Sequence, residues 1–352
     1  MARAKFSLAK TPLPTQNLLV NAVETARSQS HIDLVPPGHI ALEPKARGGR
    51  YAYWCRFVAG KLERQYLGPE GEENHQAAAA ELEQLKLHQA AAKSLRKLGF
   101  ESVEHDAALV IAELSNAGVF AGGGVLIGTR AFGALLNTLG WQATPHLGTQ
   151  DVDLARPAAL KLVTPLGDDG FFQLLQKTGL RFAPVMGLER PPGPPTSYKV
   201  VGKDLKVDLL VPSRLKTKPY ATVSVKELGA HATSLPFLQY LTDAPSDTLV
   251  IGRDHLIPVR VPQPGRYAMH KLVVADIRSG ADNPKVEKDL VQAGILAAIL
   301  TSDDQEELLT AARDLTPAMR KHARNSLPRW RQIMGASEYR PVVDLVTSAL
   351  EP

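Results

Sequence analysis

The chain has 352 residues, of which 44% are hydrophobic and 22% charged, and this balance excludes a wholly disordered protein or a fibrous repeat. At roughly 150 residues per domain, the length predicts two or three domains. The one cysteine, Cys55, excludes an intrachain disulfide and a zinc site built from several cysteines. The formal net charge of +5 slightly favours polyanionic partners.

The first residues lack the continuous apolar stretch of a signal peptide. The longest apolar stretch of the chain, 294–300, is too short to span a bilayer. We therefore expect a cytoplasmic protein without a membrane partner, and a reducing compartment agrees with the low cysteine content.

The first third of the chain is predicted to contain helices on either side of a small β-meander. Apolar residues recur at helical spacing in 14–29. From 39 to 68 the spacing changes to the alternation of strands, with a turn at 59–61. A run rich in Ala, Leu, Glu and Lys then favours a helix at 74–98, and a second helix is predicted at 104–116.

From 119 onward the pattern is typical of a mixture of strands and helices. A helix is predicted at 129–139, followed by an extra loop at 141–148. The predicted strands are 125–127, 152–155, 197–201, 205–211, 248–251 and 256–261. The predicted C-terminal helices are 266–277, 285–300, 304–314 and 340–350.

Three carboxylates lie on the predicted strands or directly before one, in positions that suit a divalent cation. Side chains two apart on a strand face the same side, so Asp151 and Asp153 would present paired carboxylates. Asp208 on a neighbouring strand could complete the set. Because Mg²⁺ prefers hard oxygen ligands and keeps places for substrate phosphates, these residues predict a magnesium or manganese site.

A second motif lies where the strand 125–127 ends and the next helix begins. Exposed backbone N–H groups at Gly128 and Thr129, together with the helix dipole, would hold a phosphate. Gly128 would allow close approach, the Thr129 hydroxyl would add a donor, and Arg130 could bind a phosphate with two parallel hydrogen bonds. These residues therefore predict a phosphate site next to the carboxylates.

The order of these motifs resembles the nucleotidyltransferase fold of the DNA polymerase β superfamily. In both, a strand leads through Gly-Thr into a helix, Asp-x-Asp lies on the next strand, and a single later Asp lies on a third strand. More narrowly, Gly128-Thr129 and Thr149-x-Asp151-x-Asp153 resemble a bacterial group of that fold. The resemblance covers roughly 119–261 and implies that Gly128 and Thr129 contact the triphosphate of an NTP. It also implies that Asp151, Asp153 and Asp208 bind the metals, with Asp208 acting with them as ligand and base.

The resemblance implies an α/β (α+β) fold class, a mixed sheet with flanking helices. The interval between Gly128 and Asp151 is longer than the usual dozen residues of the superfamily and fits the narrower group. The expected domains are an N-terminal helix, β-meander and helical region at 1–117, a nucleotidyltransferase catalytic domain at 118–262, and a C-terminal helical domain at 263–352.

The C-terminal helices carry a second basic pattern. Lys271 and Arg278 are two helical turns apart and share a face, and Lys288-Asp289 follow on the next helix. This resembles the Lys, Arg and Lys-Asp pattern of abortive-infection and toxin nucleotidyltransferases, in which the basic residues approach the nucleotide phosphates. The resemblance therefore implies that Lys271 and Lys288 help to bind the nucleotide.

Two basic segments flank this predicted site. Five basic residues and one acidic residue occur in 47–66, interleaved with tyrosines and Trp54, a pattern that suits either nucleic-acid binding or the sheet's own core. The segment 315–337 has no acidic residue and suits a solvated helix face or a polyanion site. Its basic residues are Arg320, Lys321, Arg324, Arg329 and Arg331.

These observations predict an enzyme that moves a nucleoside monophosphate from an NTP to a hydroxyl acceptor with Mg²⁺ or Mn²⁺. RNA, such as a tRNA end, is the acceptor favoured by the basic flanks. The alternatives that remain open are a protein hydroxyl, as in AMPylation, a toxin or antiphage effector with the same chemistry, and a non-catalytic nucleic-acid-binding scaffold.

Overall fold

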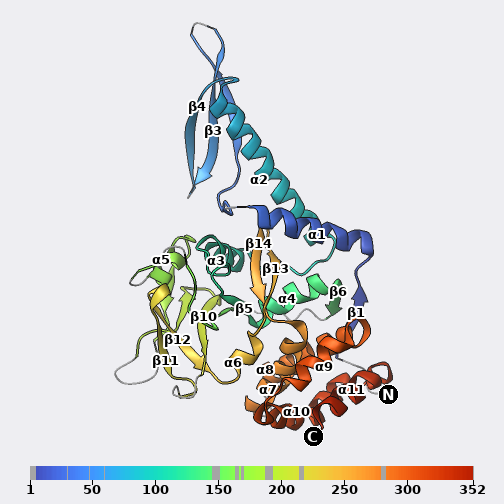
Figure 1. Cartoon of the computed structure of the whole chain (residues 1–352). Coiled ribbons are helices and arrows are strands. Elements are labelled where there is room, and N and C mark those ends of the chain that lie inside the picture. Colours follow the sequence, from blue (N-terminus) through green and yellow to red (C-terminus); the bar gives the residue numbers. More distant parts are fainter. Residues whose placement is uncertain are drawn as a thin grey trace.

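A computed structural model describes residues 5–29, 31–46, 48–58, 60–144, 151–162, 166–167, 170–186, 193–213, 218–278 and 283–351. In it, an arm made of a small sheet and the long helix α2 (Glu73–Lys97) protrudes from a larger body (Figure 1). The body combines a mixed sheet with helices, so the predicted α/β (α+β) fold class is confirmed. No helix of the described ranges is long and apolar enough to cross a membrane.

A seven-stranded sheet positions the carboxylates. Its strand order is β11-β12-β10-β7-β5, with β9 added beside β10 and β8 beside β9. Strand β10 is parallel to β7 and β12, whereas β5 is antiparallel to β7. The strands are β5 (Val125–Ile127), β7 (Val152–Ala155), β8 (Phe182–Pro184), β9 (Ser197–Val200), β10 (Lys206–Pro212), β11 (Thr222–Val225) and β12 (Ala230–Leu235).

Helices and a hairpin surround this sheet. They include α3 (His105–Asn116), α4 (Gly128–Leu139), α5 (Gly170–Gln176), η1 (Lys226–Leu228), α6 (Leu238–Leu241), β13 (Ser246–Ile251) and β14 (Leu256–Val261). The C-terminal helices are α7 (Pro264–Ile277), α8 (Pro284–Asp303), α9 (Gln305–Arg313), α10 (Pro317–Met334), η2 (Ser337–Tyr339) and α11 (Arg340–Leu350). One continuous hydrophobic core joins the sheet to these helices, with Tyr267 and Trp330 completely buried in it. The C-terminal helices are therefore packed directly on the body.

The extra loop predicted at 141–148 is wrong for its first half. Residues Trp141–Thr144 form strand β6, which pairs antiparallel with β1 (Ser7–Lys10), more than 130 residues earlier in the sequence. The Trp141 indole donates to Asp303 Oδ2 at 2.7 Å, and Lys10 Nζ lies 3.0 Å from Asp303 Oδ1. A strand with a distant partner has little local signal, which explains the error. Residues 145–148 lie outside the described ranges.

The arm contains the predicted β-meander. Strands β2 (His39–Pro44), β3 (Arg50–Val58) and β4 (Lys61–Pro69) form an antiparallel sheet, and α2 covers one face of it (Figure 1). Helix α1 (Leu13–Ser28) packs with the far end of α2 against β13 and β14. The predicted helices at 14–29, 74–98 and 104–116 are confirmed to within one residue.

Candidate active site

Strand register brings three sequence-distant residues together at one edge of the main sheet. Asp153 on β7 is the register partner of Asp208 on β10. On the other side of β7, Asp153 is also the register partner of Ile127, the last residue of β5. Gly128 follows Ile127 and begins α4. A Cβ atom built on Gly128 would lie 2.1 Å from Asp153 Oδ2, so the carboxylate lies directly against the glycine backbone.

The carboxylates at this edge repel one another. The pKa of Asp153 is raised to about 6, first by burial and then by the charges of Asp208 and Asp151. Asp208 accepts a hydrogen bond from the Ser197 hydroxyl and forms an ion pair with Lys206 Nζ at 2.9 Å. The edge therefore has an excess of negative charge, which Lys206 offsets in part.

The donor set suits a hard divalent cation in its chemistry, because it consists of carboxylate oxygens whose negative charge the nearby lysines compensate only in part. Within the described residues, no three His, Cys, Asp or Glu side chains are already grouped closely enough to hold a metal ion. Asp208 instead faces the Lys206 ammonium group. A cation bound by all three carboxylates would therefore have to compete with Lys206 for Asp208.

Gly128 has a φ of +67°, in the left-handed region that favours glycine. The Tyr267 hydroxyl, from α7, donates to the Gly128 carbonyl oxygen at 2.9 Å and lies 3.1 Å from the side-chain amide of Gln292. Burial raises the pKa of Tyr267 well above its ordinary value, so the hydroxyl keeps its proton. The helix start at Gly128 and Thr129 is thus fixed by the C-terminal helices.

A cavity of about 290 Å³ opens over this edge of the sheet. Gly128, Thr129, Asp151 and Asp153 line it from the sheet side, and α7 and α8 contribute Lys271 and Lys288. The structure therefore brings six of the predicted site residues into one cavity. Asp208 is not part of the lining and lies beside Asp153, its register partner on the neighbouring strand.

Basic residues of α7 and α8 form the opposite wall. Asp289, with a side chain only 3% exposed, holds Lys271 Nζ at 2.6 Å and also pairs with Arg278. The pKa of Lys288 is lowered to about 8, mainly by burial and then by the charge of Lys271. The cavity thus places carboxylates across from cations, an arrangement that can receive a phosphate chain together with a metal ion.

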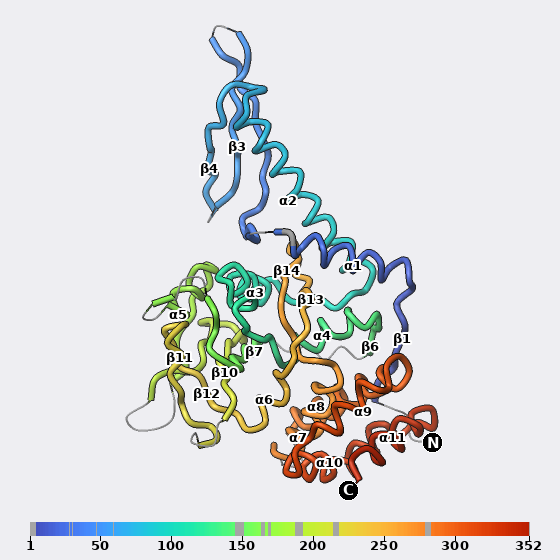
Figure 2. The backbone as a smooth tube through the Cα atoms, viewed as in Figure 1, coloured from blue at the N-terminus to red at the C-terminus, as the bar shows by residue number. Residues whose placement is uncertain are grey.

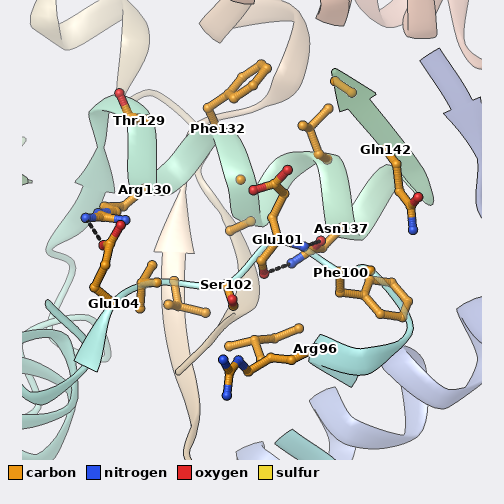
Figure 3. Close-up of a pocket in the computed structure, with 18 of the residues that line it drawn as sticks. Arg96, Phe100, Glu101, Ser102, Glu104, Thr129, Arg130, Phe132, Asn137 and Gln142 are labelled. Atoms are coloured by element: carbon orange, nitrogen blue, oxygen red, sulfur yellow. Dashed lines mark hydrogen bonds and ion pairs between the residues drawn. The ribbon is translucent and has the colours of Figure 1, made fainter. Parts of the chain in front are cut away.

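Arg130 does not line this cavity. Its side chain is 5% exposed, points into a second cavity of about 480 Å³ and forms an ion pair with Glu104 (Figure 3). Thr129 lines both cavities, because the two lie on opposite sides of the start of α4. Thr149, the first residue of the Thr-x-Asp-x-Asp motif, lies outside the described ranges.

Sequence reasoning missed several residues of the first cavity. Tyr267 lies one helical turn before Lys271. Positions 267, 271, 274 and 278 are four, three and four residues apart and so share one face of a helix, and this spacing could have identified Tyr267. His270 and Lys285 also line the cavity. Tyr220 reaches it from the segment before β11, which carries no motif that could have revealed it.

Replacing Gly128 by Ala is expected to destabilise the protein by about 1 to 3 kcal/mol, because the φ of +67° strains an L side chain. The added methyl group would also displace the Asp153 carboxylate. Denaturant unfolding measures the effect. Gly133→Ala is the matched control within α4, because Gly133 does not have a positive φ and an added Cβ there would lie 3.3 Å from its nearest neighbour, Glu101 Cβ, instead of 2.1 Å as at Gly128. Equal stabilities of the two variants would contradict the prediction.

A family model described as nucleotidyltransferase matches residues 105–317, more than half of the 352 residues. The match contains β5, β7 and β10 with their site residues, and both helices that form the basic wall. None of the curated proteins that were compared matches the chain. The chain belongs to this nucleotidyltransferase family.

Proposed function

We propose that the protein transfers a nucleoside monophosphate from an NTP to a hydroxyl group of RNA and releases pyrophosphate. The observation that carries this proposal is the cavity in which Asp151 and Asp153 lie beside the α4 start and across from Lys271 and Lys288. Family membership supports the nucleotidyl-transfer chemistry and an NTP substrate. The metal, the residue roles and the RNA acceptor are our proposals.

In the proposed site, Asp151, Asp153 and Asp208 would hold Mg²⁺ or Mn²⁺. The bound cation would neutralise the triphosphate and lower the pKa of the attacking hydroxyl. The support for this assignment is the raised pKa of Asp153, because a cation would relieve the repulsion that raises it. Lys206 would release Asp208 when the cation arrives.

The chain's own residues would bind and orient the reactants. Backbone N–H groups at Gly128 and Thr129, at the positive end of the α4 dipole, would donate to phosphate oxygens. Lys271 and Lys288 would face the same phosphates from the other wall. Asp208, oriented by the Ser197 hydroxyl, would accept the proton of the acceptor hydroxyl.

An RNA acceptor is supported by the basic segments outside the cavity, although the protein's own contacts hold part of each. In the segment 47–66, three arginines form ion pairs with acidic residues, namely Arg50, Arg56 and Arg64. In the second segment, two arginines contact neighbouring helices. Arg320 donates to the carbonyl oxygens of Ala349 and Ala312 at 2.7 and 3.0 Å, and Arg331 donates to Thr347 Oγ1 at 3.1 Å. These two arginines therefore hold helices together. Lys321 and Arg324 are exposed on α10.

Incubation of the purified protein and Mg²⁺ with each of the four NTPs, labelled at the α-phosphate, tests the proposal. Total cellular RNA and RNA-free lysate serve as separate acceptors. Label is expected in RNA, and no label is expected when the γ-phosphate carries it, because that phosphate leaves with pyrophosphate. Label confined to protein would replace RNA by a protein acceptor. RNA binding without label in any acceptor would identify a non-catalytic scaffold and overturn the proposal.

A further inference from the structure

The aromatic residues of the arm are divided between the two faces of its sheet. Trp54 and Ala52 point toward α2 and form a small separate core with Leu67, Ala78 and Leu82. The tyrosines are absent from that core. Trp54 therefore provides the aromatic part of the core between the sheet and α2, and the tyrosines lie on the face that α2 does not cover.

On that outer face, three tyrosines make a continuous cluster. Tyr53 of β3 is the register partner of Tyr66 of β4, with ring centroids 5.4 Å apart. Tyr51 lies 5.7 Å from Tyr66 in an edge-on arrangement. Tyr66 is 55% exposed, so the cluster presents ring surface to the outside.

Cations lie over these rings. Lys45 Nζ is 4.3 Å from the centroid of Tyr51, and the Arg64 guanidinium is 4.6 Å from that of Tyr53. Arg64 is also paired with Glu43, an acidic residue of the same face. Phe57 and its register partner Leu62 extend the apolar surface along the hairpin and are 62% and 52% exposed.

We propose that this tyrosine face, comprising Tyr51, Tyr53, Tyr66, Lys45 and Arg64, binds single-stranded RNA. Bases of a single strand can stack on an exposed ring such as that of Tyr66, whereas the bases of a duplex already stack on one another. Cations next to the rings would contact the phosphates between stacked bases. The choice of RNA rests on the proposed function, whereas the argument that this face binds a single-stranded nucleic acid does not.

Fluorescence anisotropy of the full-length protein with a fluorescein-labelled 15-nucleotide RNA lacking secondary structure tests the inference. The measurement omits NTP and divalent metal. Tyr66→Ala is expected to weaken binding at least about fivefold, because base-aromatic stacking is lost. Tyr66→Phe keeps the ring and should bind as the unaltered protein does. Lys45→Gln should reduce the slope of log affinity against log salt by about 0.7.

The matched control is Leu87→Ala, which removes a 58% exposed apolar side chain from α2 and should leave binding unchanged. Equal weakening by Leu87→Ala and Tyr66→Ala would overturn the inference, as would the absence of binding by the unaltered protein. Tighter binding of duplex RNA, or equal binding of single-stranded DNA of the same sequence, would also overturn it. Because no turnover is measured, failure of the proposed enzymatic function would leave this result unaffected.

Discussion

Replacing Asp153 by Asn is expected to lower the rate of nucleotidyl transfer about a thousandfold or more while stabilising the fold. Asn keeps the shape of Asp153 but removes the charge that would hold the cation against the triphosphate. Metal stabilisation of transition-state charge contributes several kcal/mol, and about 4 kcal/mol corresponds to a thousandfold in rate. Incorporation of α-labelled NTP under single-turnover conditions measures the change.

The stability of the same variant should change in the opposite direction. The folded protein raises the pKa of Asp153 from 3.8 to about 6, so the ionised carboxylate is less favourable folded than unfolded. Removing that charge should raise the free energy of unfolding by up to about 3 kcal/mol above pH 6. This gain in stability should shrink as the pH falls from 6 toward 4, because protonation of Asp153 then removes the same unfavourable charge from the unaltered protein.

Asp204→Asn is the matched control for Asp153→Asn. Asp204 precedes β10 and is 86% exposed, so the same chemical change there should alter neither rate nor stability. Full activity of Asp153→Asn, with activity assayed at several metal concentrations, would contradict the proposed role. A loss of both activity and stability would show instead that the carboxylate supports the fold.

Replacing Asp289 by Asn should destabilise the protein by about 3 to 5 kcal/mol. Asp289 is buried between α7 and α8 and neutralises both Lys271 and Arg278. Because the Lys271 side chain is only 12% exposed, removing its partner leaves a charge that water barely reaches. Denaturant unfolding at pH 7, with the midpoint and the slope both fitted, measures the loss.

Asp243→Asn provides the comparison for an exposed ion pair. Asp243 is 60% exposed and lies 3.3 Å from Arg266, which has a second partner in Asp314 at 2.6 Å. Its replacement should cost no more than about 1 kcal/mol. A similar cost for the two variants would mean that the Asp289 network is as well solvated as the surface pair, contrary to its burial.

The strands that carry the carboxylates could be predicted because their signal is local. Val125–Ile127 is a short apolar run between two glycines, and Val152–Ala155 has apolar residues on both sides of Asp153; both are strands with these bounds. Strands β11 and β12 were missed, since their pairing rather than their composition defines them. Helix α10 was missed as an element because Pro328 lies inside it and basic residues dominate its sequence.

Residue spacing explains which parts of the site could be located. Asp151, Asp153 and Gly128-Thr129 belong to recognisable motifs, and the structure brings them together. Arg130 follows Gly128-Thr129 in the same motif, but a helix turns by about 200° over two residues, so its side chain leaves α4 on another face than the one at Gly128. It therefore points into the other cavity. Tyr267 reaches Gly128 from 139 residues away, a contact that no local pattern encodes.

Helix α2 determines how far the arm extends from the body. Its 25 residues run without interruption from the small core under the β2-β3-β4 sheet to the packing of Ala92 and Leu95 against α1 and the β13-β14 hairpin (Figure 2). At 1.5 Å per residue the helix is about 37 Å long. A helix keeps its length where a flexible linker would not, so α2 acts as a rigid spacer that holds the two parts of the molecule at a constant separation.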